Sequence, residues 1–451
     1  MLPERVPRGG KNRLAIECGR ASTLPRRRIF RLLLIFHNSH SRNNLRLDLF
    51  RNGHCDYTRF CPMSLPLENS ARPSRGIAAT GLDAAIDSAL ADKRLVGAVV
   101  LVARDGELVY ARAAGLADRE NKMATREDTI FRLASVTKPI VAITAMRLVE
   151  QGRIGLDDPI TKWLPEFRPR LPDGAEAVIR IRHLLTHTSG LGYSFAEEQD
   201  GPYHRAGVSD GLDTPGRSLD DNLKRLASAP LLFAPGESWR YSLAMDVLGG
   251  IIEKETGGAL GDAVADLVMK PLGLSDTAFS VRDRRRLAAA YVNGAPEPQR
   301  MGDEATLPIL DGMIRFVPGR IFDPASYHSG GAGMAGTASD VLAILETVRK
   351  GGAPLLSADT VKVMMADQAG GNMQTQQAGF GFGFGWSVVA DPGVAQVPFS
   401  AGTIKWGGVY GHSWFVDAEK GLTVVALTNT TLEGMWGQFT TDLAKAVYAG
   451  I

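Results

Sequence analysis

The apolar and polar positions of the chain predict strands near both ends of its main body and helices between them. An amphipathic pattern predicts a helix over 82–90, and two apolar runs on either side of Arg104-Asp105-Gly106 predict a β-hairpin. A largely apolar stretch predicts a buried helix over 140–149. Later patterns predict strands over 380–389, 403–409, 412–417 and 422–428, and a last helix over 440–447.

The middle of the chain, from about residue 155 to 320, is rich in Pro and Gly and predicts short helices. Strands at both ends around a helical middle predict an α+β fold, with an antiparallel sheet, terminal helices beside it and an inserted, mostly helical domain. We assign 78–155 and 320–451 to the sheet domain and 156–319 to the insertion. Alternation within 380–389 predicts that Phe380, Phe382 and Phe384 share one strand face.

Composition and charge exclude several classes of protein. The 451 residues are 44% hydrophobic and 22% charged, which is ordinary for a globular protein, and the formal net charge is +2. This near-neutral charge argues against general binding to nucleic acid or to a membrane surface. Residues 1–62 carry a net charge of +9 and the remaining residues one of −7. The first 62 residues therefore differ in kind from the main body.

All three cysteines (Cys18, Cys55 and Cys61) lie in that basic segment, so the main body has no disulfide framework and no cysteine metal site. Its apolar run, 32–36, is shorter than a membrane span or a secretory signal requires. We expect residues 1–62 to be a disordered extension, or sequence upstream of a true start at Met63. A basic transit-type leader is the alternative. The expected location is cytoplasmic.

One short motif could supply a nucleophile. Ser135-Val136-Thr137-Lys138 has the S-x-x-K spacing, which places both side chains on one helix face, one turn apart. A serine hydroxyl needs a base, and a buried lysine of lowered pKa can act as one. The helix N-terminus adds backbone N–H groups for a developing oxyanion. Alone, this tetrapeptide would more often be an ordinary helix start.

The surroundings of this motif resemble the serine β-lactamase and penicillin-binding protein superfamily. The resemblance rests on the segment 131–138, on Leu184-Leu185-Thr186-His187-Thr188-Ser189-Gly190, and on Pro235-Gly236 followed by Trp239, Tyr241 and Ser242. It runs from about 82 to 448 and is nearest to family VIII carboxylesterases. It implies a β-lactamase-like fold, with Ser135 as nucleophile and Lys138 and Tyr241 as proton-transfer groups.

Two departures from the β-lactamase pattern favour an ester as substrate. The Y-x-N element is Tyr241-Ser242-Leu243, so Leu243 replaces the Asn that binds an amide side chain in β-lactamases. The K-T-G element is replaced by Trp406-Gly407-Gly408, a change shared with family VIII esterases, which offers an indole in place of a cation. Lys405 should point away from Trp406, because strand side chains alternate.

The resemblance also implies an oxyanion hole made of the backbone N–H groups of Ser135 and Val409. Trp406, Gly407, Gly408, Leu243 and His412 are the expected substrate-binding residues. We expect no metal and no organic cofactor. The expected partner is a small-molecule ester, with no nucleic acid and no membrane, and the oligomeric state does not follow from the sequence.

Four other patterns offer rival chemistry. Gly207-Val208-Ser209-Asp210-Gly211 matches G-x-S-x-G but lacks the flanking strand, so we expect a surface loop. The G-x-G-x-x-G at 331–336 lacks a preceding strand, so we expect a turn before a helix capped by Thr337 or Ser339. The His183 and His187 pair has zinc-ligand spacing, but a structural role is favoured. His412 with Asp417 is a weaker alternative base for Ser135.

The sequence thus predicts a serine esterase for short acyl esters with weak side activity on β-lactams. A β-lactamase or D,D-peptidase, an acyltransferase, and a non-catalytic scaffold on the same fold remain alternatives.

Overall fold

The computed structural model describes residues 79–370, 375 and 377–450. Expectations about residues 1–62 lie outside this part of the chain. The described residues belong to one unit, which runs from Leu65 to Ile451. None of their helices has the length and apolar character needed to cross a membrane.

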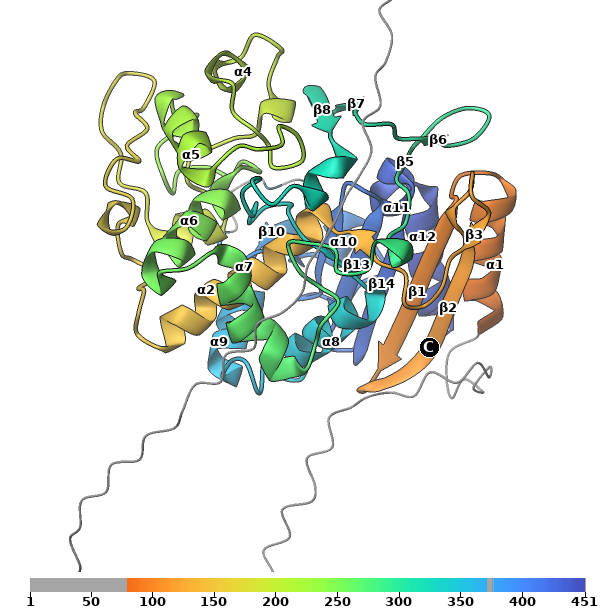
Figure 1. Ribbon diagram of the computed structural model, residues 1–451. Helices are drawn as coiled ribbons and strands as arrows, with labels where there is room; N and C mark the ends of the chain where they lie inside the picture. Colours follow the sequence, from red (N-terminus) through yellow and green to blue (C-terminus); the bar gives the residue numbers. More distant parts are fainter. Residues whose placement is uncertain (1–78, 371–374, 376, 451) are drawn as a thin grey trace, which may run out of the picture. The chain divides into compact units, whose positions relative to one another are not determined.

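An eight-stranded sheet in the order β10-β11-β12-β13-β14-β1-β2-β3 forms the centre of this unit, and each pair of neighbouring strands is antiparallel (Figure 1). The first strands of the chain therefore pair with the last, which confirms the predicted α+β sheet. The strands are β1 Gly97–Arg104, β2 Glu107–Asp118, β3 Met123–Ala124, β10 Phe380–Phe382, β11 Ser387–Val389, β12 Ile404–Gly408, β13 His412–Asp417 and β14 Leu422–Thr428.

The two faces of the sheet are covered by different helices because its side chains alternate. On β1, Val100 and Val102 pack with the terminal helices α1 (Ala79–Ala91) and α12 (Gln438–Ala449). Val99 and Leu101 belong to the larger core on the opposite face, which also contains most of α2 (Thr137–Glu150) and the apolar side of α8 (Ala338–Arg349). Eleven of the fourteen α2 residues are buried, as expected for a helix that is apolar all round.

The region 156–319 carries the short helices that the sequence predicts, and it also contains two hairpins that the sequence analysis missed. The hairpins are β5 (Tyr291–Val292) with β6 (Gln299–Arg300) and β7 (Ala305–Ile309) with β8 (Gly312–Phe316). Its helices are α3 Ile181–Leu185, α4 Pro202–Ala206, α5 Leu219–Ser228, α6 Ala244–Thr256 and α7 Leu260–Val264, the last followed by a π-helical turn, Ala265–Met269. The assignment of this region as a separate domain stays a prediction.

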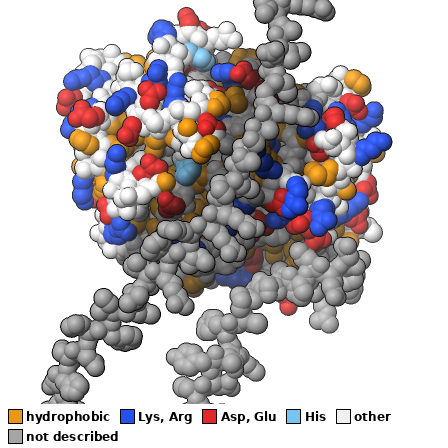
Figure 2. All heavy atoms as spheres, in the orientation of Figure 1, with side chains coloured by type: hydrophobic (Ala, Val, Ile, Leu, Met, Phe, Trp, Pro, Cys, Tyr) orange, Lys and Arg blue, Asp and Glu red, His pale blue; other side chains and the backbone are white. Residues whose placement is uncertain are grey.

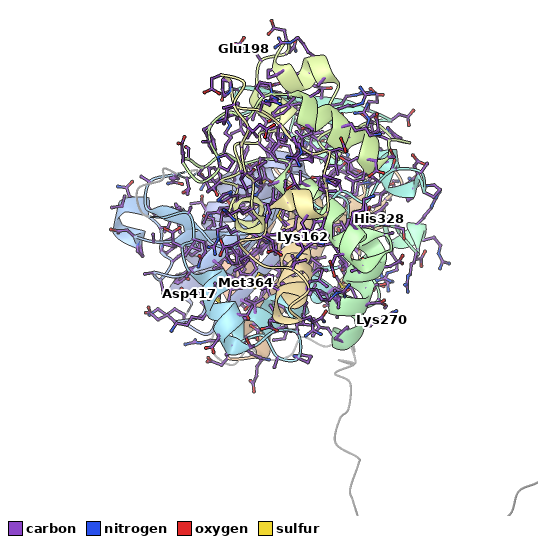
Figure 3. All side chains as sticks on the ribbon, turned by 90° about the vertical axis from the view of Figure 1, so that its left-hand side faces the viewer. Lys162, Glu198, Lys270, His328, Met364 and Asp417 are labelled. Atoms are coloured by element: carbon purple, nitrogen blue, oxygen red, sulfur yellow. The ribbon has the colours of Figure 1, made fainter. Side chains whose placement is uncertain are left out.

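Figure 3 shows how far this region extends from the sheet. Glu198 and Lys270, which both belong to it, lie at the top and the lower right, whereas Asp417 of β13 lies on the left. Figure 2 shows Lys and Arg interspersed with Asp and Glu on the face it displays, in keeping with the near-neutral net charge.

One strand prediction is wrong. The segment 380–389 is a hairpin, β10 and β11, and not a single strand. The chain turns at Gly385, whose φ of +94° favours glycine. Phe382 and Phe384 enter the larger core, whereas Phe380 packs with the cluster around α1 and α12, so the three rings do not share one face.

The remaining helices and short strands of the described residues lie outside the elements named above. They are β4 Phe131–Arg132 with β9 Ala335–Gly336, α9 Ala358–Met365, α10 Pro392–Ala395 and α11 Thr431–Trp436. Thr337 caps α8 by accepting the N–H of Asp340, as expected.

Candidate active site

Ser135 lies where a short strand meets the buried helix α2. Strand β4 pairs with β9, and the chain then forms one 3₁₀ turn, Ala134–Val136, before α2 begins at Thr137. Ala134 has φ +45°, a left-handed conformation that costs a non-glycine residue roughly 1 kcal/mol. The pairing on one side and the helix on the other hold this strained residue, which aims Ser135 away from the core.

The side-chain groups of Lys138 and Tyr241 both lie within hydrogen-bond distance of the Ser135 hydroxyl. The Lys138 Nζ donates to Ser135 Oγ at 3.1 Å and to the Gly331 carbonyl at 2.7 Å. The hydroxyls of Ser135 and Tyr241 lie 2.6 Å apart, within hydrogen-bond distance. Lys138 is completely buried, whereas Ser135 and Tyr241 are half-buried. The structure therefore brings the predicted serine, lysine and tyrosine together around one accessible hydroxyl.

Burial controls the protonation of this group. Burial lowers the pKa of Lys138 well below its ordinary 10.5, and the negative charges of Asp246 and Asp210 oppose this effect. Burial raises the pKa of Tyr241, which its hydrogen bond with Ser135 partly offsets. A lysine of lowered pKa can accept a proton near neutral pH, while the tyrosine keeps its own proton. Lys138 is thus suited to act as the base, and Tyr241 to pass a proton on.

Three further residues complete the wall around Lys138, and the sequence analysis missed their importance. Tyr193 has its ring centroid 5.4 Å from Lys138 Nζ and 4.9 Å from that of Tyr241. Asp246 on α6 is buried with no hydrogen-bond partner for either carboxylate oxygen among the described residues, and burial raises its pKa. A Cβ at Gly331 would lie 2.7 Å from Asp246 Oδ2. An acidic residue within an apolar helical run was the available signal for Asp246.

The segment His187-Thr188-Ser189-Gly190, called here the Thr-Ser-Gly loop, packs against Tyr241 through His187. His187 is fully buried, its ring centroid lies 5.0 Å from that of Tyr241, and its Nδ1 is 3.0 Å from the Ser242 hydroxyl. The His187 carbonyl accepts the N–H of Arg240 at 3.0 Å. These contacts give His187 a structural role, and His183, whose Nδ1 accepts the N–H of Arg180, is not part of the same cluster.

The end of β12 packs directly against the segment before Ser135. A Cβ at Gly408 would lie 2.3 Å from the Leu133 carbonyl, so only glycine permits this approach. Val409 follows in the turn in which the Gly411 N–H donates to the Gly408 carbonyl at 2.8 Å. Such a turn does not use the N–H of its second residue, here Val409. This geometry supports the predicted oxyanion hole, which stays a prediction.

Trp406 forms an aromatic border beside the site. Its ring centroid lies 5.4 Å from that of Tyr241 and 5.3 Å from that of Phe382. Lys405 points to the opposite face, where its Nζ lies over the rings of Phe380 and Phe399, as predicted. Substrate contact by Trp406 and Gly407 stays a prediction.

Two predicted substrate contacts need correction. Leu243 and His412 both have side chains with no exposed surface. His412 Nε2 lies 2.7 Å from the Arg132 carbonyl, and burial lowers the histidine pKa to about 4. These residues form the wall behind the site and do not face a ligand. His412 is also not paired with Asp417, which accepts the N–H groups of Ser400 and Lys420.

The rival serine does not lie in a surface loop, because Ser209 is completely buried. Its hydroxyl donates to Asp213, and its N–H donates to Asn222 Oδ1 at 2.8 Å. Within the described residues, no group of three or more His, Cys, Asp or Glu side chains could hold a metal ion. The Ser135 cluster is therefore the best-supported catalytic site of the described chain.

Comparison with known proteins agrees with this site. The Beta-lactamase family model matches residues 82–447, and the chain belongs to this family. The chain is 54% identical over 376 residues to esterase EstB of Burkholderia gladioli, covering 82% of this chain and 95% of EstB.

Solved structures agree with the fold as well. EstCE1, described as a hydrolase with promiscuous acyltransferase activity, is 44% identical with a TM-score of 0.81, covering 82% of this chain and 98% of EstCE1. Simvastatin synthase from Aspergillus terreus, unliganded as a selenomethionyl derivative, is 24% identical with a TM-score of 0.65, covering 84% of this chain and 99% of its own. The second likeness concerns the fold alone.

Proposed function

We propose that this chain is a serine carboxylesterase that hydrolyses short-chain acyl esters through an acyl-enzyme. The observation that carries the proposal is the hydrogen-bonded contact of Ser135 with both Lys138 and Tyr241. The 54% identity to an esterase over most of both chains supports the substrate class. Trp406 borders the site where β-lactamases carry a cationic residue, which favours an uncharged ester carbonyl over a β-lactam.

In the proposed mechanism, neutral Lys138 accepts the Ser135 proton as Oγ attacks the ester carbonyl. The N–H groups of Ser135 and Val409 stabilise the oxyanion. As the bond to the alcohol breaks, the proton passes through Tyr241 to the leaving oxygen. Water then gives its proton to the same groups and attacks the acyl-enzyme. Collapse of this second intermediate releases the acid and returns the proton to Ser135.

The test compares initial rates on 4-nitrophenyl butyrate and on nitrocefin, with wild type and Ser135→Ala in parallel. We expect rapid ester cleavage that disappears in the variant, and slow nitrocefin turnover. Faster turnover of nitrocefin than of the ester would contradict the preference assigned to Trp406. Ester cleavage that survives in Ser135→Ala would refute the assignment of the nucleophile.

Acyl transfer to an alcohol is a second candidate activity, favoured by the similarity to EstCE1, a hydrolase with promiscuous acyltransferase activity. An alcohol would replace water in the second half of the reaction, with the same proton path. Adding increasing methanol and measuring the ratio of methyl ester to free acid tests this. A ratio no higher than that of the uncatalysed reaction would leave hydrolysis as the activity.

A further inference from the structure

A cavity of about 520 Å³ begins three residues before the nucleophile, at Arg132. Its lining includes Arg132, Arg300, Met301, Val317 and Pro318. Arg132 also lines a smaller cavity together with Met334 and Tyr410. Met334 accepts the Leu133 N–H, and Tyr410 follows the proposed oxyanion-hole residue Val409. Arg132 therefore lines both cavities, and it lies three residues before Ser135 in the chain.

Arg132 has a positive charge that no carboxylate of the described residues neutralises. Its Nε donates to the Pro318 carbonyl at 2.9 Å and its Nη1 to the Ala288 carbonyl at 3.0 Å. Within the described chain it forms no ion pair, and its Nη2 has no hydrogen-bond partner. Nη2 is also not among the buried unpartnered atoms, so it keeps some accessible surface. The Pro318 and Ala288 carbonyls thus hold the guanidinium in place, and its Nη2 remains able to donate to a ligand.

Two further arginines strengthen the positive potential on the same side. The Arg284 guanidinium lies 4.0 Å from the Phe322 ring centroid, and that of Arg132 lies 5.8 Å from the same centroid. Arg320 is 7% exposed and donates to the Tyr327 carbonyl at 2.8 Å. Neither Arg284 nor Arg320 forms an ion pair with the described residues. Arg320 belongs to the 3₁₀ segment Pro318–Phe322, and Arg132 and Arg284 lie beside its Phe322 ring. The carboxylates of Asp246 and Asp323 interact electrostatically with Arg320 without forming an ion pair with it.

Acidic groups near the cavity do not cancel this charge. Asp118 and Glu120 pair with Arg300, at 2.7 and 3.2 Å. Asp303 also lines the cavity, but it is exposed to water, which screens its charge. Partial burial of an unpaired guanidinium costs free energy through desolvation, and a bound anion offsets this cost. Arginine is also the side chain best suited to bind a carboxylate through two parallel hydrogen bonds.

We propose that Arg132 binds an anionic group, such as a carboxylate, carried by the ester substrate, with Arg284 and Arg320 adding to the attraction. The inference rests on the proposed esterase function and makes it more specific: the preferred substrates are esters that keep a free negative charge at a distance from the scissile bond. That charge belongs either to the acyl part or to the alcohol part of the ester.

Two matched substrate pairs test the inference and distinguish these two positions. The acyl pair is 4-nitrophenyl hydrogen glutarate and its neutral methyl ester. The alcohol pair is 4-acetoxybenzoate and its neutral methyl ester. In Arg132→Gln we expect the ratio of kcat/KM for the anionic over the neutral member to fall at least about tenfold in one pair, which corresponds to the loss of one hydrogen bond to a charged group. The pair that responds identifies the part that carries the charge.

Controls separate binding from damage to the fold. Arg170→Gln removes an exposed arginine paired with Glu176, and it should leave both ratios unchanged. Arg284→Gln keeps both carbonyl bonds of Arg132 and should lower the responding ratio about threefold through the lost potential. If Arg132→Gln does not fold, Arg284→Gln and the wild-type salt dependence decide, because added NaCl should lower the same ratio.

Unchanged ratios in the folded Arg132 and Arg284 variants, or a wild-type ratio that does not respond to salt, would overturn the anion site while leaving the esterase intact. Failure of the wild type to hydrolyse even the neutral esters would instead refute the proposed function, and the inference with it.

Discussion

Two serines of this chain lie in recognisable sequence motifs, yet their surroundings differ. Ser135 is half-buried and contacts a lysine amine and a tyrosine hydroxyl. Ser209 is fully buried, donates its proton to the carboxylate of Asp213 and accepts the N–H of Gly211 at 3.2 Å. The first serine can be deprotonated by a base while it faces a substrate. The second has its proton and a lone pair occupied by the fold.

The difference shows that a nucleophile is defined by what lies beside its hydroxyl. A buried lysine without a matched ion pair has a lowered pKa and can take a proton. A carboxylate that already accepts the Ser209 proton only fixes the loop, and no lysine or histidine of the described residues is hydrogen-bonded to that hydroxyl. The motif around Ser209 is therefore a structural junction between its loop and α5, which carries Asn222.

The largest expected effect separates the two serines directly. Ser135→Ala should lower kcat/KM on 4-nitrophenyl butyrate by about 10⁴-fold or more, because the attacking atom is lost. Ser209→Ala should change it less than about threefold once folded protein is quantified. Labelling with a fluorophosphonate probe should likewise disappear only in Ser135→Ala. The comparison fails if the two variants lose activity to the same extent.

The next effect concerns the groups that make the first serine reactive. Lys138→Ala and Tyr241→Phe should each lower kcat by about 10²- to 10⁴-fold, the usual range for loss of a proton-transfer group. Asp213→Asn at the second serine is the matched control and should leave kcat within about threefold. Circular dichroism and thermal melts confirm that each variant is folded. A kcat near wild type in Lys138→Ala would exclude this lysine as the base.

A smaller effect is expected from crowding the wall of the site. In Gly331→Ala the new Cβ would lie 2.7 Å from Asp246 Oδ2 and 2.9 Å from the Tyr193 hydroxyl. The clash should displace the Lys138 amine from Ser135. We therefore expect kcat to fall about tenfold and the free energy of unfolding to fall by roughly 1–3 kcal/mol. Gly258→Ala, whose Cβ would have no neighbour nearer than 3.9 Å, is the control. Equal melting temperatures and rates in both variants would contradict this close packing.

The smallest effect is a displacement of the pH profile. The negative charge of Asp246 raises the pKa of Lys138 against the stronger effect of burial. Asp246→Asn removes that charge, so the pKa of Lys138 should fall further. Because the neutral amine is the active form, activity is lost as pH falls, and this acid limb should move to lower pH by about one unit. The pH dependence of kcat/KM in wild type and Asp246→Asn measures this displacement. An acid limb displaced to higher pH would contradict the assignment of Lys138 as the base.

Much of the site could be predicted because its central residues are local in sequence or lie in distinctive motifs. Ser135 and Lys138 are one helical turn apart, so helix geometry alone brings them together. Tyr241 follows from its Pro-Gly and Trp neighbours. Asp246 carried only the signal of an acidic residue in an apolar helical run, and Tyr193 reaches Lys138 only through the packing of the folded chain.

The sequence by itself determined the antiparallel sheet and the helices on its faces, because alternation and helical spacing are local properties. It also led to the proposed triplet of Ser135, Lys138 and Tyr241, through helical spacing and short motifs. Only the tertiary structure decided that His412 and Leu243 are buried, that Ser209 is a structural residue, and that Arg132 lines a cavity and has no carboxylate partner among the residues the structure describes. These properties depend on contacts between residues far apart in the chain. Burial and charge compensation are set by such contacts, and no spacing rule encodes them.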